Sequence, residues 1–259
     1  MNSTCEKCKE RGSLGFDISM AFQPIVNLDT FEYASYEALV RGPNNEGAGE
    51  IFKNVNDDNL YLFDQSCRTK AIELASSLNL NTYLSINFMP NAVYEPARCI
   101  QSTLQAAKKY NFPLDSLIFE FTEQEEVRDN GHLRKIVSDY QQRGFLTAID
   151  DFGAGYSGLM LLCELGVDIV KIDRALIQDI DQNPRKQLIV KHLYKLLAST
   201  TNRVVVEGVE TREELEILYA FGYRYFQGYY FAKPGFECLP TVDFEAIKRV
   251  LNESKFVLN

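Results

Sequence analysis

Short runs of β-branched and aromatic residues alternate with longer amphipathic stretches, and this alternation constrains the fold more than any other feature of the sequence. The runs predict strands at Ala21–Val26, Glu32–Val40, Thr82–Phe88, Leu117–Thr122, Phe145–Asp150, Asp168–Ile172, Arg203–Glu207 and Tyr223–Gln227. The stretches with apolar residues at helical spacing are Leu60–Leu78, Ala97–Tyr110, His132–Arg143, Arg185–Thr200 and Arg212–Phe221. Repeated strand–helix units predict an α/β protein with a parallel sheet, which at 259 residues is a (β/α)₈ barrel or a large doubly wound sheet. Only Asn27–Phe31 separates the first two runs, so we expect a hairpin and one antiparallel strand.

Residues 1–18 fall outside this pattern, because they are polar and interrupted by glycine. We therefore expect a short N-terminal segment followed by one domain over residues 19–259. The segment contains Cys5 and Cys8 at C-x-x-C spacing, which is half of a zinc site or a redox pair. No second pair follows at zinc-ribbon spacing. The pair either has no role of its own or is completed by a partner chain or by another cysteine.

The remaining cysteines, Cys67, Cys99, Cys163 and Cys238, lie among apolar neighbours. This predicts reduced cysteines packed in a core and a cytoplasmic location. No stretch reaches the roughly 18 apolar residues that a membrane span needs, and Met1–Met20 shows no secretory signal.

The charge balance limits the partners that the surface can bind. The chain has 27 basic and 36 acidic side chains and a formal net charge of −9. That balance argues against binding bulk nucleic acid by phosphate neutralisation. A small anionic ligand stays compatible with it, because bound divalent metals can invert the local charge.

Charged and amide side chains stand at the ends of the predicted strands, where a plain core would have apolar residues. They are Glu37, Asn87, Glu120, Asp150, Asp151, Lys171, Glu207 and Gln227. Because side chains alternate across a strand, Glu37 shares one face with Leu39 and Arg41, and Asp150 shares one with Ala148. In a barrel that face is the interior, and sites form at the C-terminal ends of the strands.

Five of these strand-end side chains are carboxylates and one is a lysine, which makes them costly to bury unless they are paired or bind metal. An all-oxygen ligand set fits Mg²⁺ or Mn²⁺ better than zinc. The adjacent Asp150 and Asp151 suggest a carboxylate that bridges two ions. The alternative, that these residues are simply solvated at the barrel mouth, weakens with each further strand that ends in the same way. His132 and His192 lie in predicted helices and are expected to be surface or helix-packing residues.

A series of short motifs runs from about Met20 to Val250. In order, they are Phe22–Ile25, Glu37–Arg41, Ser85–Asn87, Glu120–Glu123, Asp150–Ser157, Lys171–Asp173, Glu207–Glu210, Gln227–Tyr229 and Lys233–Pro234. Glu37–Arg41 reads Glu-Ala-Leu-Val-Arg and looks like the signature of the EAL domain. The ordered set resembles this family, the cyclic di-GMP phosphodiesterases of bacterial signalling. The resemblance implies a modified TIM barrel with one antiparallel strand, and metal-assisted hydrolysis of one phosphodiester of cyclic di-GMP to give linear pGpG.

The resemblance also implies a role for each matching residue. The implied ligands of the first metal are Glu37, Asn87, Glu120 and Asp150, and those of the second are Asp150, Asp151 and Glu207. Lys171 matches the residue that contacts the attacking water. Glu210 and Gln227 match groups that position water or support the ligands, and Glu123 matches the acid that anchors the loop after Asp151. The implied substrate contacts are Gln23, Leu39, Arg41, Asp173 and Pro234, with Arg41 on phosphate and Gln23 near a guanine.

Two loop positions depart from the commonest pattern of the family: Ala154 stands where threonine is frequent and Gly158 where serine is frequent. Neither change removes an expected ligand, which favours an active phosphodiesterase over a silent EAL-like module that binds the dinucleotide or a protein partner. A TIM-barrel metalloenzyme acting on another phosphate or sugar substrate is a third hypothesis. Family members often dimerise through the segment that corresponds to Tyr156–Leu165. Its apolar run is either part of a homodimer interface or the core face of a barrel helix.

Overall fold

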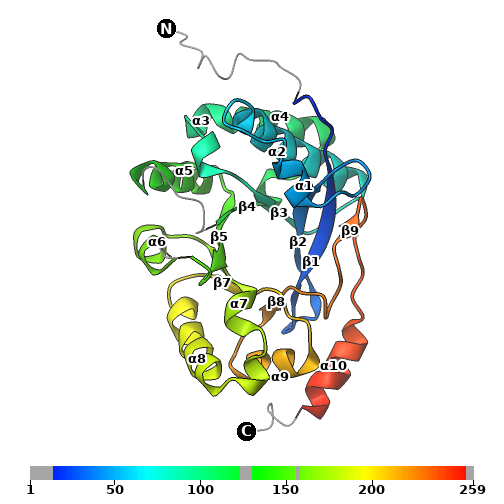
Figure 1. Ribbon diagram of the computed structural model, residues 1–259, viewed down its shortest axis with the longest axis vertical. Coiled ribbons are helices and arrows are strands. Elements are labelled where there is room, and N and C mark those ends of the chain that lie inside the picture. The colour runs from blue at the N-terminus through cyan, green and yellow to red at the C-terminus, as the bar shows by residue number, and fades with distance from the viewer. Residues whose placement is uncertain (1–13, 123–129, 156–157, 255–259) are drawn as a thin grey trace.

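The protein, seen in a computed structural model, is described over residues 14–122, 130–155 and 158–254. Its strands form one sheet whose ends meet, so that the sheet closes into a barrel (Figure 1). The strands are β1 (Ser19–Asn27), β2 (Glu32–Arg41), β3 (Tyr83–Asn87), β4 (Leu117–Thr122), β5 (Leu146–Phe152), β6 (Ile169–Ile172), β7 (Arg203–Val206), β8 (Tyr225–Phe226) and β9 (Gly235–Phe236).

The order of the strands identifies the barrel. From β2 to β8 each strand pairs in parallel with the next strand along the chain. The strand β1 closes the ring and runs antiparallel to both of its neighbours, β2 and β8. The short strand β9 pairs with β1 in addition. These pairings confirm the predicted (β/α)₈ barrel and its hairpin, and they make β1 the antiparallel strand.

Helices surround the ring of strands (Figure 1). They are α1 (Ala48–Phe52), α2 (Leu60–Ser77), α3 (Pro96–Cys99), α4 (Gln101–Tyr110), α5 (Asn130–Gln142), α6 (Gly158–Glu164), α7 (Arg174–Ile177), α8 (Pro184–Ala198), α9 (Arg212–Ala220) and α10 (Phe244–Glu253). The predicted helix over Ala97–Tyr110 is divided at Ile100 into α3 and α4. The sequence prediction missed α10, although Asp243 caps it by accepting a hydrogen bond from the backbone of Ala246.

Two apolar cores lie on the two sides of the barrel wall. The larger core fills the space between the strands and the helices. The smaller core lies inside the barrel and contains Ile25, Ile118, Ala148, Ile169 and Val205. Because inward-facing residues recur every second position, the next inward residue on several strands stands one step nearer the C-terminal end. The inner core is therefore the floor on which a site at the strand ends is built.

The cysteines are only partly where the sequence pattern predicts them. Cys99 is buried and Cys67 is half-buried, but Cys163 and Cys238 are exposed, so the prediction of a core position is wrong for these two. Cys163 is the next-to-last residue of the short helix α6 and faces outward, and Cys238 lies in a turn after β9, where apolar sequence neighbours do not imply burial. Cys5 and Cys8 lie outside the described residues. Within the described ranges, no helix is both long enough and apolar enough to cross a membrane.

Candidate metal centre at the carboxyl ends of the strands

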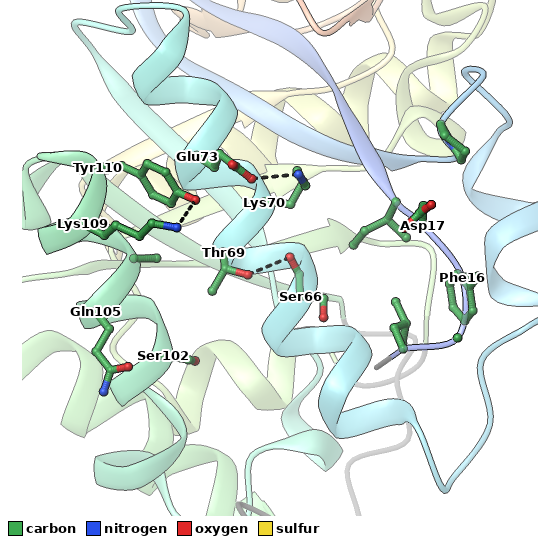
Figure 2. Close-up of a pocket in the computed structure, with 15 residues that line it drawn as sticks. Phe16, Asp17, Ser66, Thr69, Lys70, Glu73, Ser102, Gln105, Lys109 and Tyr110 are labelled. Atoms are coloured by element: carbon green, nitrogen blue, oxygen red, sulfur yellow. Dashed lines mark hydrogen bonds and ion pairs between the residues drawn. The ribbon is translucent and has the colours of Figure 1, made fainter. Parts of the chain in front are cut away.

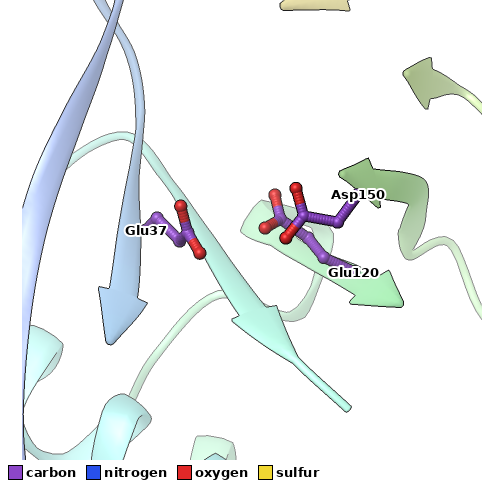
Figure 3. A group of neighbouring side chains, drawn as sticks. All are labelled: Glu37, Glu120 and Asp150. Atoms are coloured by element: carbon purple, nitrogen blue, oxygen red, sulfur yellow. The ribbon is translucent and has the colours of Figure 1, made fainter. Parts of the chain in front are cut away.

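The strand-end polar residues converge inside the mouth of the barrel. Glu120 follows Ile118 by two residues, and Asp150 follows Ala148 by two, so each carboxylate stands directly above an inner-core side chain. Figure 3 shows the carboxylates of Glu37, Glu120 and Asp150 on β2, β4 and β5, projecting into the space that these strands surround. The two-residue alternation of strand side chains that directs the inner-core residues into the barrel thus also directs these carboxylates into it.

Lys171 is the centre of this cluster. Its side chain is fully buried, and its Nζ atom lies close to carboxylates from four other strands or strand ends. The distances are 3.1 Å to Oε2 of Glu37, 2.8 Å to Oε2 of Glu120, 3.0 Å to Oδ1 of Asp150 and 2.7 Å to Oε1 of Glu207. One ammonium cannot neutralise four carboxylates, so this acid cluster keeps an excess of negative charge.

The acids form two groups that share one member. Oxygen atoms of Glu37, Glu120 and Asp150 lie within 4.8 Å of one another, and so do oxygen atoms of Asp150, Asp151 and Glu207. The shared residue is Asp150. All the ligand atoms in these two groups are carboxylate oxygens, the donor type that suits hard divalent cations. Each group therefore offers a donor set that could hold such an ion, and Asp150 is available to both.

A break in the strand allows neighbouring residues to serve both groups. In a regular strand, Asp150 and Asp151 would point to opposite faces. The pairing of β5 with β6 shifts register between Ile149 and Phe152, and Asp151 has a left-handed φ of 53°. This bulge brings the Asp151 carboxylate to the same side as Asp150, where it also accepts a hydrogen bond of 3.3 Å from Thr122 Oγ1.

The crowding of acids changes their titration. Burial, together with Glu37 and Asp150, raises the pKa of Glu120 to about 8, although Lys171 opposes the shift. Burial, followed by Asp150 and Asp173, raises the pKa of Asp151 to about 6. Burial acts to lower the pKa of Lys171, but Asp150, Glu120 and Glu207 outweigh it and raise that pKa well above its usual range. The lysine is therefore held as an ammonium.

Amide side chains complete the rim of the cluster. Asn87 Nδ2 donates to Glu37 Oε1 over 2.9 Å, and Gln227 Nε2 donates to Glu37 Oε2 over 2.9 Å. Gln23, on β1, is next to Gln227, with 3.4 Å between Gln227 Nε2 and Gln23 Oε1. The buried Oε1 atom of Gln227 has no hydrogen-bond partner among the residues that the structure describes. A buried acceptor without a protein partner is available to a water molecule or a ligand.

Other predicted residues lie around the mouth and do not join the acid cluster. Arg41 and Leu39 line a pocket of about 260 Å³ between β2, β3 and α2, together with Asn87. Asp173 caps α7 by accepting a hydrogen bond of 2.8 Å from the backbone of Ala175. Pro234 immediately precedes β9 and is half-buried.

Glu210 lies apart from the acid cluster, and the position of Glu123 is not described. Glu210 forms an ion pair of 2.6 Å with Arg174 at the start of α7, so it ties the loop after β7 to α7. Glu123 lies outside the described residues, as does Tyr156 at the start of the predicted dimer segment. The histidines are placed as predicted: His192 contacts the Leu188 carbonyl within α8, and His132 contacts the Val93 carbonyl from α5.

A larger pocket lies away from the barrel mouth and lacks the chemistry of the strand ends. It has a volume of about 970 Å³ and lies between α2, α4 and residues 14–18 (Figure 2). Its lysines are already engaged, since Lys70 pairs with Glu73 at 2.8 Å and Lys109 donates to the Tyr110 hydroxyl at 2.9 Å. The acid cluster, which is chemically distinctive, is the candidate functional site.

Sequence reasoning missed two features near the site. Thr122, two residues after Glu120 on the same strand face, supports Asp151, and the period of two could have indicated it. Asp64 and Arg68 form a fully buried ion pair on α2 behind the barrel wall. Their spacing of four residues on the apolar face of a helix was the available signal.

Comparison with known proteins places this geometry in a family. The EAL domain profile matches residues 12–234. The blue light- and temperature-regulated antirepressor BluF of Escherichia coli is 28% identical over 223 residues, which cover 86% of this chain and 55% of BluF. The cyclic di-GMP phosphodiesterase PA2567 of Pseudomonas aeruginosa is also 28% identical over 223 residues, covering 83% of this chain and 38% of PA2567. The chain thus spans about half or less of the length of these curated relatives.

Solved structures agree with this assignment. A standalone versatile EAL protein from Vibrio cholerae, in its c-di-GMP bound form, has a TM-score of 0.87 and 54% identity, with 90% of this chain and 99% of that chain covered. BlrP1 of Klebsiella pneumoniae, in a manganese/cy-diGMP complex, has a TM-score of 0.82 and 33% identity, with 88% and 58% covered. The barrel, the shared-acid site and the match over most of the sequence lead to one conclusion: this chain belongs to the EAL domain family.

Proposed function

We propose that the chain is a metal-dependent phosphodiesterase that hydrolyses cyclic di-GMP to linear pGpG. The observation that carries this proposal is the acid cluster, in which two groups of carboxylates share Asp150 around a buried lysine. The family, the phosphodiesterase PA2567 and the dinucleotide bound to the Vibrio cholerae structure support the choice of substrate.

The proposed cofactors are two Mg²⁺ or Mn²⁺ ions. Glu37, Asn87, Glu120 and Asp150 would hold the first, and Asp150, Asp151 and Glu207 the second. Ions bound there lower the pKa of water and offset the negative charge that develops on the phosphate during hydrolysis. The all-oxygen donor set and the manganese in the BlrP1 complex support this proposal.

The side chains of the protein would divide the remaining tasks. Lys171, held as an ammonium at the centre of the acids, would donate a hydrogen bond to the attacking water and align it with the phosphorus. The open Oε1 atom of Gln227 would accept a hydrogen bond from water in the same space. Arg41, at the mouth, would bind phosphate through its planar guanidinium.

Further residues would hold the substrate or the loops. Leu39, Asp173 and Pro234 at the mouth and Gln23 on the wall would contact the dinucleotide. Glu210, through its ion pair with Arg174, would fix the loop after Glu207. We keep for Glu123 the role of anchoring the loop after Asp151.

A direct assay tests the proposed function. The purified chain is incubated with cyclic di-GMP and Mn²⁺ or Mg²⁺, and pGpG is measured by chromatography. We expect conversion with metal and none after exhaustive chelation. Glu50→Gln, which changes an exposed acid on α1, is the control and keeps full activity. Hydrolysis that survives chelation would overturn the metal-dependent mechanism. Tight binding of the dinucleotide without hydrolysis would instead favour the second candidate, a silent module.

We also propose that the chain forms a homodimer and acts in the cytoplasm. Leu159 and Met160, on α6, are 58% and 60% exposed, whereas Leu161 on the same helix is buried. The helix thus has both a core face and an exposed apolar face, and the exposed one supports a dimer contact. The four free cysteines in the described part of the chain support a reducing compartment. Sedimentation analysis of the wild type and of Leu159→Glu tests the dimer.

A further inference from the structure

A second buried charge site lies on the outer side of the barrel wall. Asp64 and Arg68 stand one turn apart on α2, and their side chains are 1% and 0% exposed. Arg68 Nη2 lies 2.7 Å from Asp64 Oδ2. A buried ion pair is often no more stabilising than an apolar pair of similar volume. Stability alone therefore does not account for it, and its contacts point to another role.

The carboxylate of Asp64 connects α2 to the end of β3. Its Oδ1 atom accepts a hydrogen bond of 2.9 Å from the backbone N–H of Met89. Met89 follows the last residue of β3, Asn87, by two positions. Asn87 is exposed at this strand end and reaches Glu37 through its side-chain amide. Asp64 thus fixes the backbone immediately after a proposed metal ligand.

The guanidinium of Arg68 contacts the outer side of β4 and the residue that follows β3. Its central carbon lies 5.4 Å from the ring centroid of Phe88 and 5.5 Å from that of Phe119. These rings point outward directly next to the inward-pointing Asn87 and Glu120, which are register partners on β3 and β4. Arg68 Nη1 also donates a hydrogen bond of 2.8 Å to the hydroxyl of Tyr140, on α5.

We infer that Asp64 and Arg68 are positioning residues for metal binding. The pair fixes the C-terminal end of β3 against β4, so that Asn87 reaches its ligand position beside Glu37. Residues that orient ligands from behind typically change metal affinity by about 10–100-fold when they are replaced. This inference rests on the proposed metal site, but it predicts metal affinity independently of any hydrolysis.

A pair of double variants separates positioning from stability. Asp64→Asn with Arg68→Met removes both charges but keeps a side-chain oxygen for the Met89 N–H. Asp64→Leu with Arg68→Met removes the charges and the acceptor. Ile72→Val, on the same buried side of α2, is a control for modest loss of stability. For each protein, Mn²⁺ binding is measured by titration calorimetry, pGpG formation is measured against Mn²⁺ concentration, and the melting temperature is recorded in chelator.

We expect the leucine variant to bind Mn²⁺ about tenfold more weakly, with turnover largely recovered at saturating metal. The asparagine variant and Ile72→Val should bind Mn²⁺ within about twofold of the wild type, which is a small change beside the roughly tenfold loss expected when a positioning residue is replaced. If the leucine variant does not fold, Asp64→Ala with Arg68→Met replaces it under the same expectation.

The outcomes separate this inference from the proposed function. Equal Mn²⁺ affinity in all folded variants would overturn the inference, even if the wild type hydrolyses cyclic di-GMP. Equally weak binding in both double variants would overturn the part assigned to the Met89 contact. A wild type that binds Mn²⁺ but forms no pGpG would overturn the proposed function, while the calorimetric comparison would still decide the inference. A wild type without Mn²⁺ binding would overturn both.

Discussion

The two buried charge sites of this protein lie on opposite sides of the same barrel wall and differ in their balance of charge. Inside, Lys171 faces four carboxylates within 3.1 Å. Outside, Arg68 faces one carboxylate and is surrounded by aromatic rings. The outer pair is neutral, whereas the inner acid cluster has surplus negative charge that protons or cations must offset. This difference indicates that the outer site serves the structure of the wall and the inner one serves binding.

The two sites also share their supports. At the C-terminal ends of β3 and β4, Asn87 and Glu120 point inward, and the adjacent Phe88 and Phe119 carry rings that contact Arg68. A change on the outer side can reach the inner side through the backbone of two short strands, without any direct contact between the charges.

The largest expected effect comes from Asp150→Asn, because Asp150 belongs to both groups of acids. Hydrolysis should fall on the order of 10³-fold. In chelator, the free energy of unfolding should be unchanged or higher, because one of several like charges is removed. Asp64→Asn should instead lower it by about 3 kcal/mol, since Arg68 then stays buried without an anion. Urea unfolding in chelator measures the free energy of unfolding of both variants. Equal losses of this free energy in Asp150→Asn and Asp64→Asn would contradict the distinction between the sites.

The second largest effect is expected from replacing Lys171, the buried cation of the inner cluster, and it is compared with the replacement of Arg68, the buried cation of the outer pair. Lys171→Ala should lower turnover by about 10²-fold, because the water loses the group that aligns it. Cyclic di-GMP should still bind, since the metal ligands and Arg41 are intact. Titration calorimetry beside a pGpG assay tests this, with Arg68→Met as the outer-wall control, whose turnover at saturating metal should change only a few-fold. If Lys171→Ala loses binding and turnover in proportion, the lysine serves substrate affinity instead.

A smaller effect is expected from pH. The pKa of Glu120 is raised to about 8, so below that pH its carboxyl retains a proton that a metal must displace. Metal affinity should therefore fall by about tenfold for each pH unit below about 8. Titrations in buffers of different ionisation enthalpy measure the released proton. Glu120→Gln should bind metal more weakly but with a shallower pH dependence, and an unchanged slope in that variant would assign the proton to another group.

The smallest effect should come from Arg68→Lys. The ammonium keeps a charge beside Asp64 but loses the planar stacking on the aromatic rings and the fixed reach to Tyr140. We expect a loss of about 1–2 kcal/mol in the free energy of unfolding, the size of a desolvated cation–ring contact. Urea unfolding provides the measurement, and a loss as large as that of Asp64→Asn would show that the guanidinium geometry matters as much as the charge.

Much of the fold and part of the site followed from local sequence patterns. The strand runs, the hairpin and the placement of acids at strand ends depend on neighbours within a few residues, so they were readable without a structure. The exact bounds of the strands could not be read from the sequence, and some strands are shorter than predicted. The strand predicted over Tyr223–Gln227 is only Tyr225–Phe226, because its pairing with β1 and β7 extends no further.

By itself, the sequence determined that the chain forms a parallel α/β sheet, either a barrel or a doubly wound sheet, with acids, amides and one lysine at the ends of its strands, because residue period and composition specify which side chains share a face. The tertiary structure alone decided which of them meet. Lys171 contacts Glu37 across 134 positions of sequence, the bulge at Asp151 joins two acid groups, and Glu210 pairs with Arg174 away from the cluster. Asp64 and Arg68 gained a role only when α2 packed behind β3. These contacts depend on the closure of the ring and on the packing of helices against it, which no local pattern encodes.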